Sequence, residues 1–420
     1  MTDRPSRVVL REGTALAHAD LVPTPFDALV IEDGRIASLG AAPPPAAGDR
    51  VIDVGGAFVL PGLVDAHVHL DLTAGITAYA HWDLPPMVRG AALVRNGLLA
   101  LRHGITSVRD LGCVDHAVVQ YGRLTAAGRL LGPRVTACGR WIAMTGGHGW
   151  EYGREADGPD DVRRAAREQV RARAGVIKLM ATGGLSTPGS ADSAELGLEE
   201  LRAGVEEAHK AGLQAAAHAH APAGIEAAVL AGIDSVEHAA FADERTISLM
   251  LEHDVVLVPT LVALKYIRPG CGVDPDVVEK SEAAREIFAG SIRRAIAAGI
   301  TVGAGTDAGT ALNPIGLLVD ELQYYAELGM SAHDAVRSAT VVAGGLVGDR
   351  VGAIEEGWAA DLAIFAEDPR EDLERLRRPR LVVAAGRPVD MEWLGATIAA
   401  LGAEESDRLL DLTPIEGVGR

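Results

Sequence analysis

The chain of 420 residues is long enough for two to four domains, or for one barrel with a smaller companion. Its 48% of hydrophobic and 23% of charged residues exclude a largely disordered chain, and with only 4% of aromatic residues the core must consist of Ala, Val, Leu and Ile. The net charge of -19 would repel phosphate backbones, so we expect no nucleic acid among the partners.

The N-terminal part of the chain is predicted to form short β-strands. Residues 27–39 hold two alternating runs on either side of Asp33-Gly34, which is a strong signal for a two-residue hairpin turn. A Pro/Ala-rich loop follows at 41–47. Residues 50–59 are then expected to form one further strand.

The middle of the chain, 61–345, alternates short apolar runs with amphipathic helical patterns. Eight strands are predicted, at 62–68, 105–109, 134–141, 175–180, 213–219, 233–237, 255–261 and 300–305. Helices are predicted at 92–103, 117–128, 160–173, 197–211, 221–231, 243–253, 279–298, 315–328 and 332–345. This alternation predicts an α/β fold with a parallel sheet, and eight is the number of strands that closes a (β/α)8 TIM barrel.

Strand patterns return near the C-terminal end, at 352–365 and 380–389. Because they resemble the first part of the chain and not the middle, we expect 1–60 and 346–390 to pair into one small β-sandwich domain. The tail at 391–420 is expected to hold a helix and an irregular end.

In a TIM barrel the chemical groups stand at the carboxyl ends of the strands. The first predicted strand ends in GLVDAHVHL, and His67 and His69 face the same side because side chains at i and i+2 point the same way. Two imidazoles directed at one point suit a metal site, although such a pair can also be two hydrogen-bonded histidines near a turn. For Asp65 we expect a structural role and not ligation.

The fourth predicted strand carries Lys178 in the middle of the apolar run GVIKLM. A buried ammonium is costly unless its charge is neutralised or paired. Only four of the 39 cationic residues are lysines, so this chain rarely uses lysine as a surface cation. The ammonium could reach water, but the functional alternatives are a Schiff-base lysine, a buried ion pair, or a carbamate formed with CO2 whose oxygens bridge two metal ions.

Histidine and carboxylate residues recur where later strands end, in the runs AHAH, VEH and GTDAG. Each of His218, His238 and Asp307 could be a hydrogen-bonded polar residue if it stood alone. Together with His67 and His69 they fall on one predicted rim. Four imidazoles and a carboxylate suit zinc or another borderline divalent ion.

Two glycine-rich loops after predicted strands are expected to contact the substrate. His148 lies in MTGGHGW after the third strand, where glycines let the backbone approach a ligand closely. Gly183 and Gly184 begin a similar loop after the fourth strand, which we expect to close over the site. Arg109 and Asp110, after the second strand, are expected to form an ion pair that holds the loops at the rim.

These motifs resemble the amidohydrolase superfamily of metal-dependent hydrolases over roughly 5–390. PGLVDAHVHL is similar to the opening strand of that superfamily, and the later motifs follow in its order: ITSVRDLG, TGGHG, KLMATGG, AHAH, VEHA and GTDAG. Within the superfamily the chain resembles the imidazolonepropionase-like branch. In that branch it is similar to the binuclear group of Xaa-Pro dipeptidases, arginine/lysine carboxypeptidases and ochratoxin-type amidases.

The resemblance implies a TIM barrel beside a small β domain, and two divalent ions, for which we expect zinc. The implied ligands are His67, His69 and Asp307 for one ion, His218 and His238 for the other, and carboxylated Lys178 (N6-carboxylysine) as the bridge. His220 takes the place of a tyrosine or histidine that contacts substrate. The loop at 185–193 departs from the dipeptidase patterns, so the resemblance leaves the substrate open.

Two such ions would hold a bridging hydroxide and polarise a carbonyl. Asp307 would take the proton during attack and pass it to the leaving nitrogen, and His148 would help to bind or polarise the scissile carbonyl. The first hypothesis is therefore a binuclear amidase or peptidase that cleaves a dipeptide or N-acyl amino acid and releases a C-terminal amino acid. The second is a hydrolase of a cyclic amide, carbamate, urea or specialised metabolite on the same centre. The third, a non-catalytic barrel that binds metal or a partner, is disfavoured by the intact ligand set.

The remaining features concern location and partners. Three sparse cysteines argue against a disulfide framework and fit a reducing compartment. The first residues show no signal-peptide pattern, and no apolar run approaches the ~18 residues of a membrane helix. We expect a cytoplasmic enzyme that acts on a small amide or peptide, without nucleic acid or membrane partners, and the resemblance implies a homo-oligomer.

Overall fold

The computed structural model describes residues 7–185, 191–348 and 350–401. The strands are β1 (Arg7–Ala17), β2 (Val22–Glu32), β3 (Arg35–Gly40), β4 (Asp49–Asp53), β5 (Phe58–Pro61), β6 (Leu63–Val68), β7 (Ile105–Asp110), β8 (Arg134–Ala137), β9 (Ile142–Ala143), β10 (Arg154–Glu155), β11 (Val176–Met180), β12 (Gln214–Ala219), β13 (Ser235–His238), β14 (Val256–Val258), β15 (Leu362–Phe365), β16 (Leu381–Ala384) and β17 (Arg387–Pro388).

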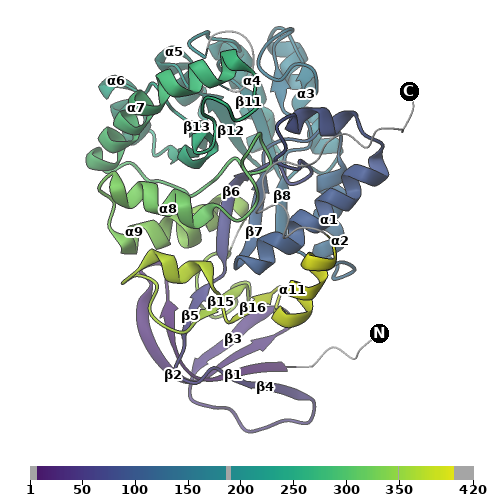
Figure 1. Ribbon diagram of the computed structural model, residues 1–420, viewed down its shortest axis with the longest axis vertical. Helices are drawn as coiled ribbons and strands as arrows, with labels where there is room; N and C mark the ends of the chain where they lie inside the picture. The colour runs from purple at the N-terminus through teal and green to yellow at the C-terminus, as the bar shows by residue number, and fades with distance from the viewer. Residues whose placement is uncertain (1–6, 186–190, 349, 402–420) are drawn as a thin grey trace.

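The helices are α1 (Pro86–Arg102), α2 (Ala117–Ala126), α3 (Pro159–Arg171), α4 (Leu198–Lys210), α5 (Pro222–Leu230), α6 (Glu244–Glu252), α7 (Pro275–Ala298), α8 (Leu318–Glu327), α9 (Ala332–Arg337), α10 (Ala343–Val347) and α11 (Met391–Ala400). Short helical turns are η1 (Ala78–Asp83), η2 (Leu261–Leu264), η3 (Ser338–Val342) and η4 (Leu373–Arg377). Figure 1 shows the helices of the middle region around its strands, with the strands of the two chain ends gathered at the lower end of the molecule.

Strands from both ends of the chain form one eight-stranded sheet, in the order β17-β16-β15-β5-β1-β2-β3, with β4 also paired to β1. The central contact joins the two ends, since β5 pairs antiparallel with β15. The side chains of this sheet form a hydrophobic cluster separate from that of the middle region, with Leu10, Leu29, Val59 and Ile364 among its members. The sheet is therefore sandwich-like, and the predicted pairing of the two chain ends is confirmed.

The hairpin predicted around Asp33-Gly34 joins β2 to β3, and both turn residues have positive φ, as a type I′ turn requires. The single strand expected at 50–59 is wrong. Two consecutive glycines, Gly55 and Gly56, adopt left-handed backbone conformations and divide it into β4 and β5. Both pieces pair in parallel with β1.

The strands of the middle region are parallel and lie in two sheets, β6-β7-β8 and β10-β9-β11-β12-β13-β14. Backbone hydrogen bonds cross both gaps between these sheets. At one gap Gly175 N donates to Ala137 O over 2.8 Å, and at the other the extended segment 301–308 accepts from β14 at Thr301 O and from β6 at Ala304 O. The described hydrogen bonds therefore lead from β6 through both sheets and back to β6.

The strand expected at 300–305 is not a regular strand, which corrects the sequence expectation. Only Val302 and Ala308 in this segment make isolated parallel bridges. Gly305 explains part of the irregularity, because a Cβ atom there would lie 2.5 Å from a methyl group of Val258 and 2.9 Å from His67 Cβ. The backbone therefore passes closer to β6 than an ordinary strand residue would allow.

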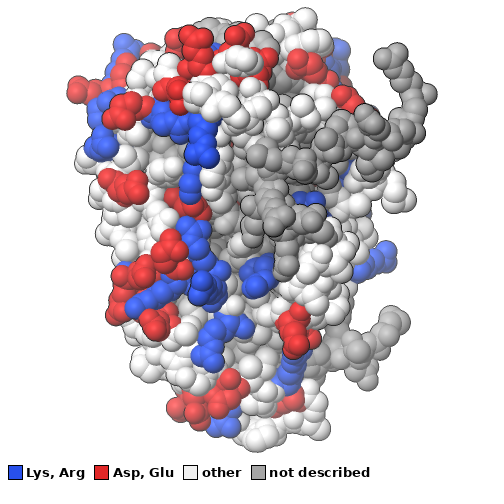
Figure 2. Space-filling model, viewed as in Figure 1, with Lys and Arg blue, Asp and Glu red and all other residues white. Residues whose placement is uncertain are grey.

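The parallel strands β6 and β11 are buried on both faces, as expected for strands enclosed by helices. In the C-terminal tail, α11 packs on α1 through a cluster that includes Leu98, Leu101, Leu394 and Ile398. Among the described residues, no helix combines the length and apolar character needed to cross a membrane. On the face shown in Figure 2, the described Lys and Arg side chains are interspersed with Asp and Glu.

Candidate metal centre

A cavity of about 430 Å³ opens where the parallel strands end. All six ligands implied by the sequence line it, and so do two further histidines, His148 and His220. Part of the wall is aromatic, because the rings of Trp82, Trp141 and Tyr152 pack on one another with centroids 5.0–5.3 Å apart. Six imidazoles, Asp307 and Lys178 add polar and charged groups to a cavity whose lining is otherwise largely apolar.

The first ligand group consists of His67, His69 and Asp307. Asp307 Oδ1 lies 3.4 Å from His67 Nε2 and 3.2 Å from His69 Nε2. The two histidines come from the end of β6, as the i and i+2 spacing predicts. Asp307 follows the irregular eighth segment, and its N–H donates to His67 O over 2.7 Å, so the close contact with β6 also brings in the carboxylate.

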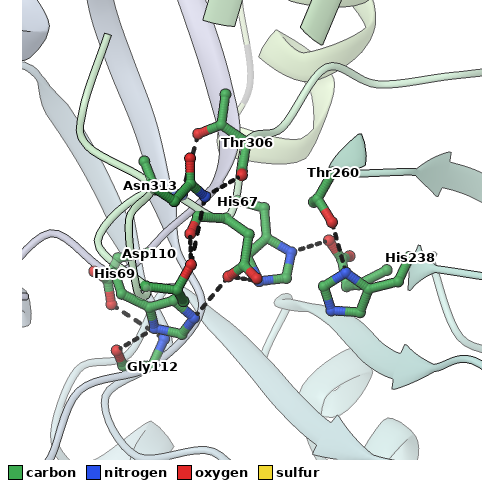
Figure 3. A network of polar contacts seen from close by, with 12 residues as sticks. His67, His69, Asp110, Gly112, His238, Thr260, Thr306 and Asn313 are labelled. Atoms are coloured by element: carbon green, nitrogen blue, oxygen red, sulfur yellow. Dashed lines mark hydrogen bonds and ion pairs between the residues drawn. The ribbon is translucent and has the colours of Figure 1, made fainter. Parts of the chain in front are cut away.

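The outer nitrogens of both rings in this group are held by acceptors (Figure 3). His67 Nδ1 lies 2.8 Å from Glu237 Oε2, and His69 Nδ1 lies 2.8 Å from Gly112 O. A carboxylate and a carbonyl only accept, so each Nδ1 carries a proton and each Nε2 is directed at Asp307. Such outer partners are the arrangement that orients metal-binding imidazoles.

Burial and neighbouring charges together give these groups different pKa values. Burial and the charge of Lys178 lower the pKa of His67 to about 4, so its Nε2 is unprotonated at neutral pH. For His69 burial acts in the same direction, but the hydrogen bond and the charge of Asp307 outweigh it and raise the pKa. Burial would raise the pKa of Asp307, yet His67 and His69 hold it below the ordinary value. A proton or a metal cation must therefore stand between these converging acceptor atoms.

The second ligand group consists of His218, His220 and His238, at the ends of β12 and β13. The ring centroid of His218 lies 4.7 Å from that of His220 and 4.6 Å from that of His238. Burial lowers the pKa of His220 to about 3 and those of the other two rings well below the ordinary value, so all three are neutral and able to act as ligands. The sequence expectation gave His220 to the substrate, whereas the structure places it beside the other two.

Left-handed backbone conformations mark this end of the strands. His238, Thr260 and Asp307 have φ values of 74°, 59° and 59°. Such conformations cost about 1–3 kcal/mol each in non-glycine residues and persist where surrounding contacts fix them. One such contact joins two of these residues, because His238 Nδ1 lies 2.7 Å from Thr260 Oγ1.

Lys178 lies on β11 and is only 2% exposed. Its Nζ atom is buried and has no hydrogen-bond partner among the described residues. Burial lowers its pKa to about 8, and its charge lowers the pKa of His67 in the first group and of His218 and His238 in the second. The amine therefore lies within electrostatic reach of both groups, and the alternative in which it reaches water is excluded, because its Nζ atom is buried.

His148 and the two glycines expected to contact substrate lie together. The ring of His148 packs against that of His218, tilted by 31° with centroids 4.2 Å apart, and burial lowers the pKa of His148 to about 4. A Cβ atom on Gly184 would lie 2.2 Å from this ring, so only glycine allows the contact. Gly183 O accepts from His218 Nε2 over 3.1 Å. The rest of the expected loop, 186–190, lies outside the described residues.

The ion pair expected between Arg109 and Asp110 is wrong. As neighbours on a strand they point to opposite sides. Arg109 is completely buried and donates to Glu237 Oε1 over 2.8 Å, while Asp110 accepts from the backbone N–H groups of Leu70 and Gly112. The loops at the rim are thus held by hydrogen bonds that backbone N–H groups donate to Asp110.

Asp65 has the structural role expected of it. Its carboxylate accepts from Thr306 Oγ1 over 2.6 Å, from Thr306 N over 3.0 Å and from His67 N over 3.3 Å. Because these donors belong to β6 and to the segment that carries Asp307, Asp65 joins the two elements that supply the first ligand group. The same region holds Asn313, which donates to Thr306 O over 2.7 Å (Figure 3).

Sequence reasoning missed two supporting residues, Glu237 and Thr260, and gave a third, Arg109, the wrong partner. Glu237 connects Arg109 to His67. Burial would raise the pKa of Glu237, but the charge of Arg109 and the hydrogen bond from His67 outweigh burial and lower this pKa to about 2. A usable signal existed for Arg109, since it interrupts an apolar strand as Lys178 does. The sequence holds no such signal for Thr260, because its contact with His238 depends on where β14 ends relative to β13.

The donor set fits metal ions. Both groups offer three ligand atoms within 4.8 Å of one another, all nitrogen or carboxylate oxygen, which suits zinc and related divalent ions. In the first group three acceptor atoms converge, and near both groups Lys178 Nζ lies buried without a partner.

Comparison with known proteins agrees with this site. The model of the amidohydrolase family matches residues 58–389. The protein named ochratoxinase from Aspergillus niger is 32% identical over 367 residues, which cover 77% of this chain and 73% of that protein. The crystal structure of a Xaa-Pro dipeptidase with bound methionine matches with a TM-score of 0.84 at 28% identity and covers 91% of this chain and 100% of the other. A prolidase structure complexed with N-methylphosphonate-L-proline gives 0.83 at 29% identity, covering 91% and 99%.

The family match spans most of the chain, and it includes every strand end that carries a candidate ligand. The protein therefore belongs to the amidohydrolase family and is a hydrolase that acts on amide bonds.

Proposed function

We propose that the protein is a binuclear metal-dependent amidohydrolase that cleaves the amide bond of a dipeptide or N-acyl amino acid and releases the C-terminal amino acid. The observation that carries the proposal is the pair of three-residue ligand groups with a buried, unpartnered Lys178 Nζ near both. A largely apolar cavity of about 430 Å³ in front of them has the size of a small-molecule site.

We interpret the ring of parallel strands as a (β/α)8 barrel, with 61–345 as its domain and 1–60 and 346–390 as the small β domain. Hydrogen bonds across both gaps between the sheets support this interpretation. It explains why all ligands lie at one end of the molecule's strands, since the carboxyl ends of barrel strands share one face.

We assign His67, His69 and Asp307 to one ion, and His218 and His238 to the other, with zinc as the expected element. His220 either completes the second group or contacts substrate; its position 4.9 Å from His238, ring to ring, is compatible with both. Bound divalent ions would supply Lewis acidity and an activated water.

Lys178 is assigned as the carbamate that bridges the two groups. The uncharged amine, which burial favours, forms a bond from Nζ to the carbon of CO2; one C–O π bond breaks and a proton is released. This replaces a buried cation with an anion that has two oxygen atoms, one for each ligand group. The unfavourable position of a bare ammonium among six histidines supports this assignment.

Asp307 is proposed as the group that moves the proton. Oδ1 faces the two Nε2 atoms of the first group, so Oδ2 would take the proton from the attacking water and deliver it to the leaving nitrogen. His148 lines the cavity next to the ring of His218 and would hold the scissile carbonyl. Glu195, whose carboxylate accepts from His148 N over 2.8 Å, fixes the loop that carries this ring.

The names of the relatives support an amide with an amino acid leaving group: a dipeptidase, a prolidase bound to a proline phosphonate, and ochratoxinase. To test this, the purified protein is first analysed for bound metal, with two ions per chain expected. It is then supplied with zinc and given a panel of dipeptides, N-acyl amino acids, cyclic amides, carbamates and ureas.

Release of a free amino acid from the first two classes supports the proposal. Turnover confined to the last three classes would replace it with the alternative hydrolase. Less than one divalent ion per chain in a fully active preparation would overturn the binuclear assignment. A homo-oligomer and a cytoplasmic location stay predictions, and light scattering would check the first.

A further inference from the structure

The short helix η2 begins directly after Thr260, but Thr260 does not cap it. A threonine in this place usually has an extended backbone, and its hydroxyl accepts from a backbone N–H two or three residues later. Thr260 instead has a left-handed backbone with a φ of 59° and makes no such bond. Its Oγ1 lies 2.7 Å from His238 Nδ1. The first N–H groups of η2 therefore need another acceptor, because a buried N–H without a partner is costly.

Glu321 of α8 supplies that acceptor. Its Oε1 accepts from Leu261 N over 2.9 Å, and its Oε2 accepts from Val262 N over 2.7 Å. Each carboxyl oxygen thus serves one of the first two residues of η2. The neighbouring Asp320 forms an ion pair with Lys265, which directly follows η2. Helix α8 therefore holds η2 at both ends.

The position of Glu321 is costly for a carboxyl group. Glu321 is completely buried, and it is not among the described residues that line the cavity. Burial raises its pKa to about 8, although the hydrogen bonds from Val262 and Leu261 act in the opposite direction. Such a group is stable inside a protein only if hydrogen bonds compensate the lost hydration. With or without a proton on the carboxyl group, both of its oxygens are used as acceptors by the start of η2.

We propose that Glu321 is a positioning residue that caps η2 from α8 and thereby leaves the hydroxyl of Thr260 free to orient the imidazole of His238. With Nδ1 donating to Thr260 Oγ1, the Nε2 atom of His238 is the one left to act as a ligand. The consequence for a metal ion rests on the proposed function. The cap and the orientation of the ring do not, and both can be measured in the metal-free protein.

Glu321→Gln tests the effect on metal binding, because glutamine keeps the shape of the side chain but has one acceptor oxygen where two are used. In a chelator competition, zinc affinity of the second group should fall about threefold to tenfold. The affinity of the first group should change by no more than about twofold, because Glu321 has no part in its support. Glu207→Gln removes a carboxylate that pairs with Arg167 and Lys210 on the surface of α4, and it serves as the control for a general loss of stability.

The double variant Glu321→Gln/Thr260→Val distinguishes positioning through Thr260 from a merely structural role. If both residues act through one hydrogen bond to His238, the double variant should lose no more than about twofold beyond the larger single loss. Losses that multiply would overturn the proposal, and so would equal losses at both ligand groups. If Glu321→Gln does not fold, Glu321→Asp takes its place, because it keeps the charge but shortens the reach to Leu261 and Val262.

Crystal structures of the metal-free wild type and of Glu321→Gln separate this inference from the proposed function. In the variant we expect Thr260 to become an ordinary cap of η2, with an extended backbone and with Oγ1 more than ~3.5 Å from His238 Nδ1. A variant in which Thr260 keeps its left-handed backbone and its bond to His238 would overturn the inference. If the wild type binds fewer than two ions and the variant still shows the change, the proposed function fails and the role of Glu321 stands.

Discussion

The two ligand groups of the cavity differ in their charge and in the hydrogen-bond partners that orient their imidazole rings. In the first, the ring of His67 is held by the carboxylate of Glu237 and the ring of His69 by a backbone carbonyl, and Asp307 adds a negative charge of its own. In the second, all three members are imidazoles; His238 is held by a threonine hydroxyl, and His220 Nδ1 has no hydrogen-bond partner among the described residues.

This difference predicts that the two groups bind their metal ions with different affinities. The first group is oriented in advance and carries negative charge, so it should bind an ion tightly without help. The second group is neutral, and burial opposes any cation there unless an anion is added. Within the described residues around it, Lys178 is the group that can become such an anion, which makes the second ion dependent on modification of the lysine.

Asp307→Asn should produce the largest effect on turnover, because it keeps an oxygen ligand in the first group and removes the proton acceptor. General acid–base groups contribute typically ~10²–10⁴-fold, so kcat should fall by that factor while most of the metal and the thermal unfolding midpoint are retained. Steady-state kinetics with metal analysis checks this. A variant within about threefold of the wild-type kcat would show that the proton is carried elsewhere.

Lys178→Ala tests the dependence of the second group directly. We expect loss of one ion per chain and a loss of activity at least as large as the ~10–100-fold that follows changes to outer partners of a metal site. Short carboxylic acids such as propionate should restore part of both, because their oxygens can occupy the vacated bridge. A variant that keeps two ions and normal kcat without added acid would contradict the carbamate assignment, as would density for a bare amine in an active two-ion crystal.

Glu237→Gln probes the support of the first group. Zinc affinity of that group should fall ~10–100-fold, since the neutral amide orients His67 less strongly. The unfolding midpoint should fall as well, because Arg109 would keep a buried charge without its counter-ion. Competition with a chromophoric chelator measures the affinity, and calorimetry the stability. Unchanged affinity together with reduced stability would mean that Glu237 serves Arg109 alone.

Thr260→Val should give the smallest effect. It removes one uncharged hydrogen bond to His238 at nearly constant volume, so the second ion should bind about twofold to tenfold less tightly. The chelator competition used for Glu237→Gln provides the matched comparison. If both variants weaken the same ion to the same extent, the two groups do not differ as proposed.

The sequence by itself determined where the candidate ligands stand. His67 and His69 alternate along one strand, and His218, His238 and Asp307 each follow an apolar run, so strand periodicity and parallel strand direction bring them to one edge. The cost of a buried ammonium singled out Lys178. These inferences depend on the periodicity of each strand and on the common direction of the strands, so they needed no knowledge of which strands are neighbours.

The tertiary structure alone decided which groups support these ligands. Glu237 reaches His67 across 170 residues of sequence and Arg109 reaches Glu237 across 128, and both contacts depend on the register of strands that are not adjacent in the chain. The irregular eighth segment likewise follows from a close approach of Gly305 to β6. Periodicity reports which face of a strand is buried, but the atom that lies opposite is fixed only when several strands pack together.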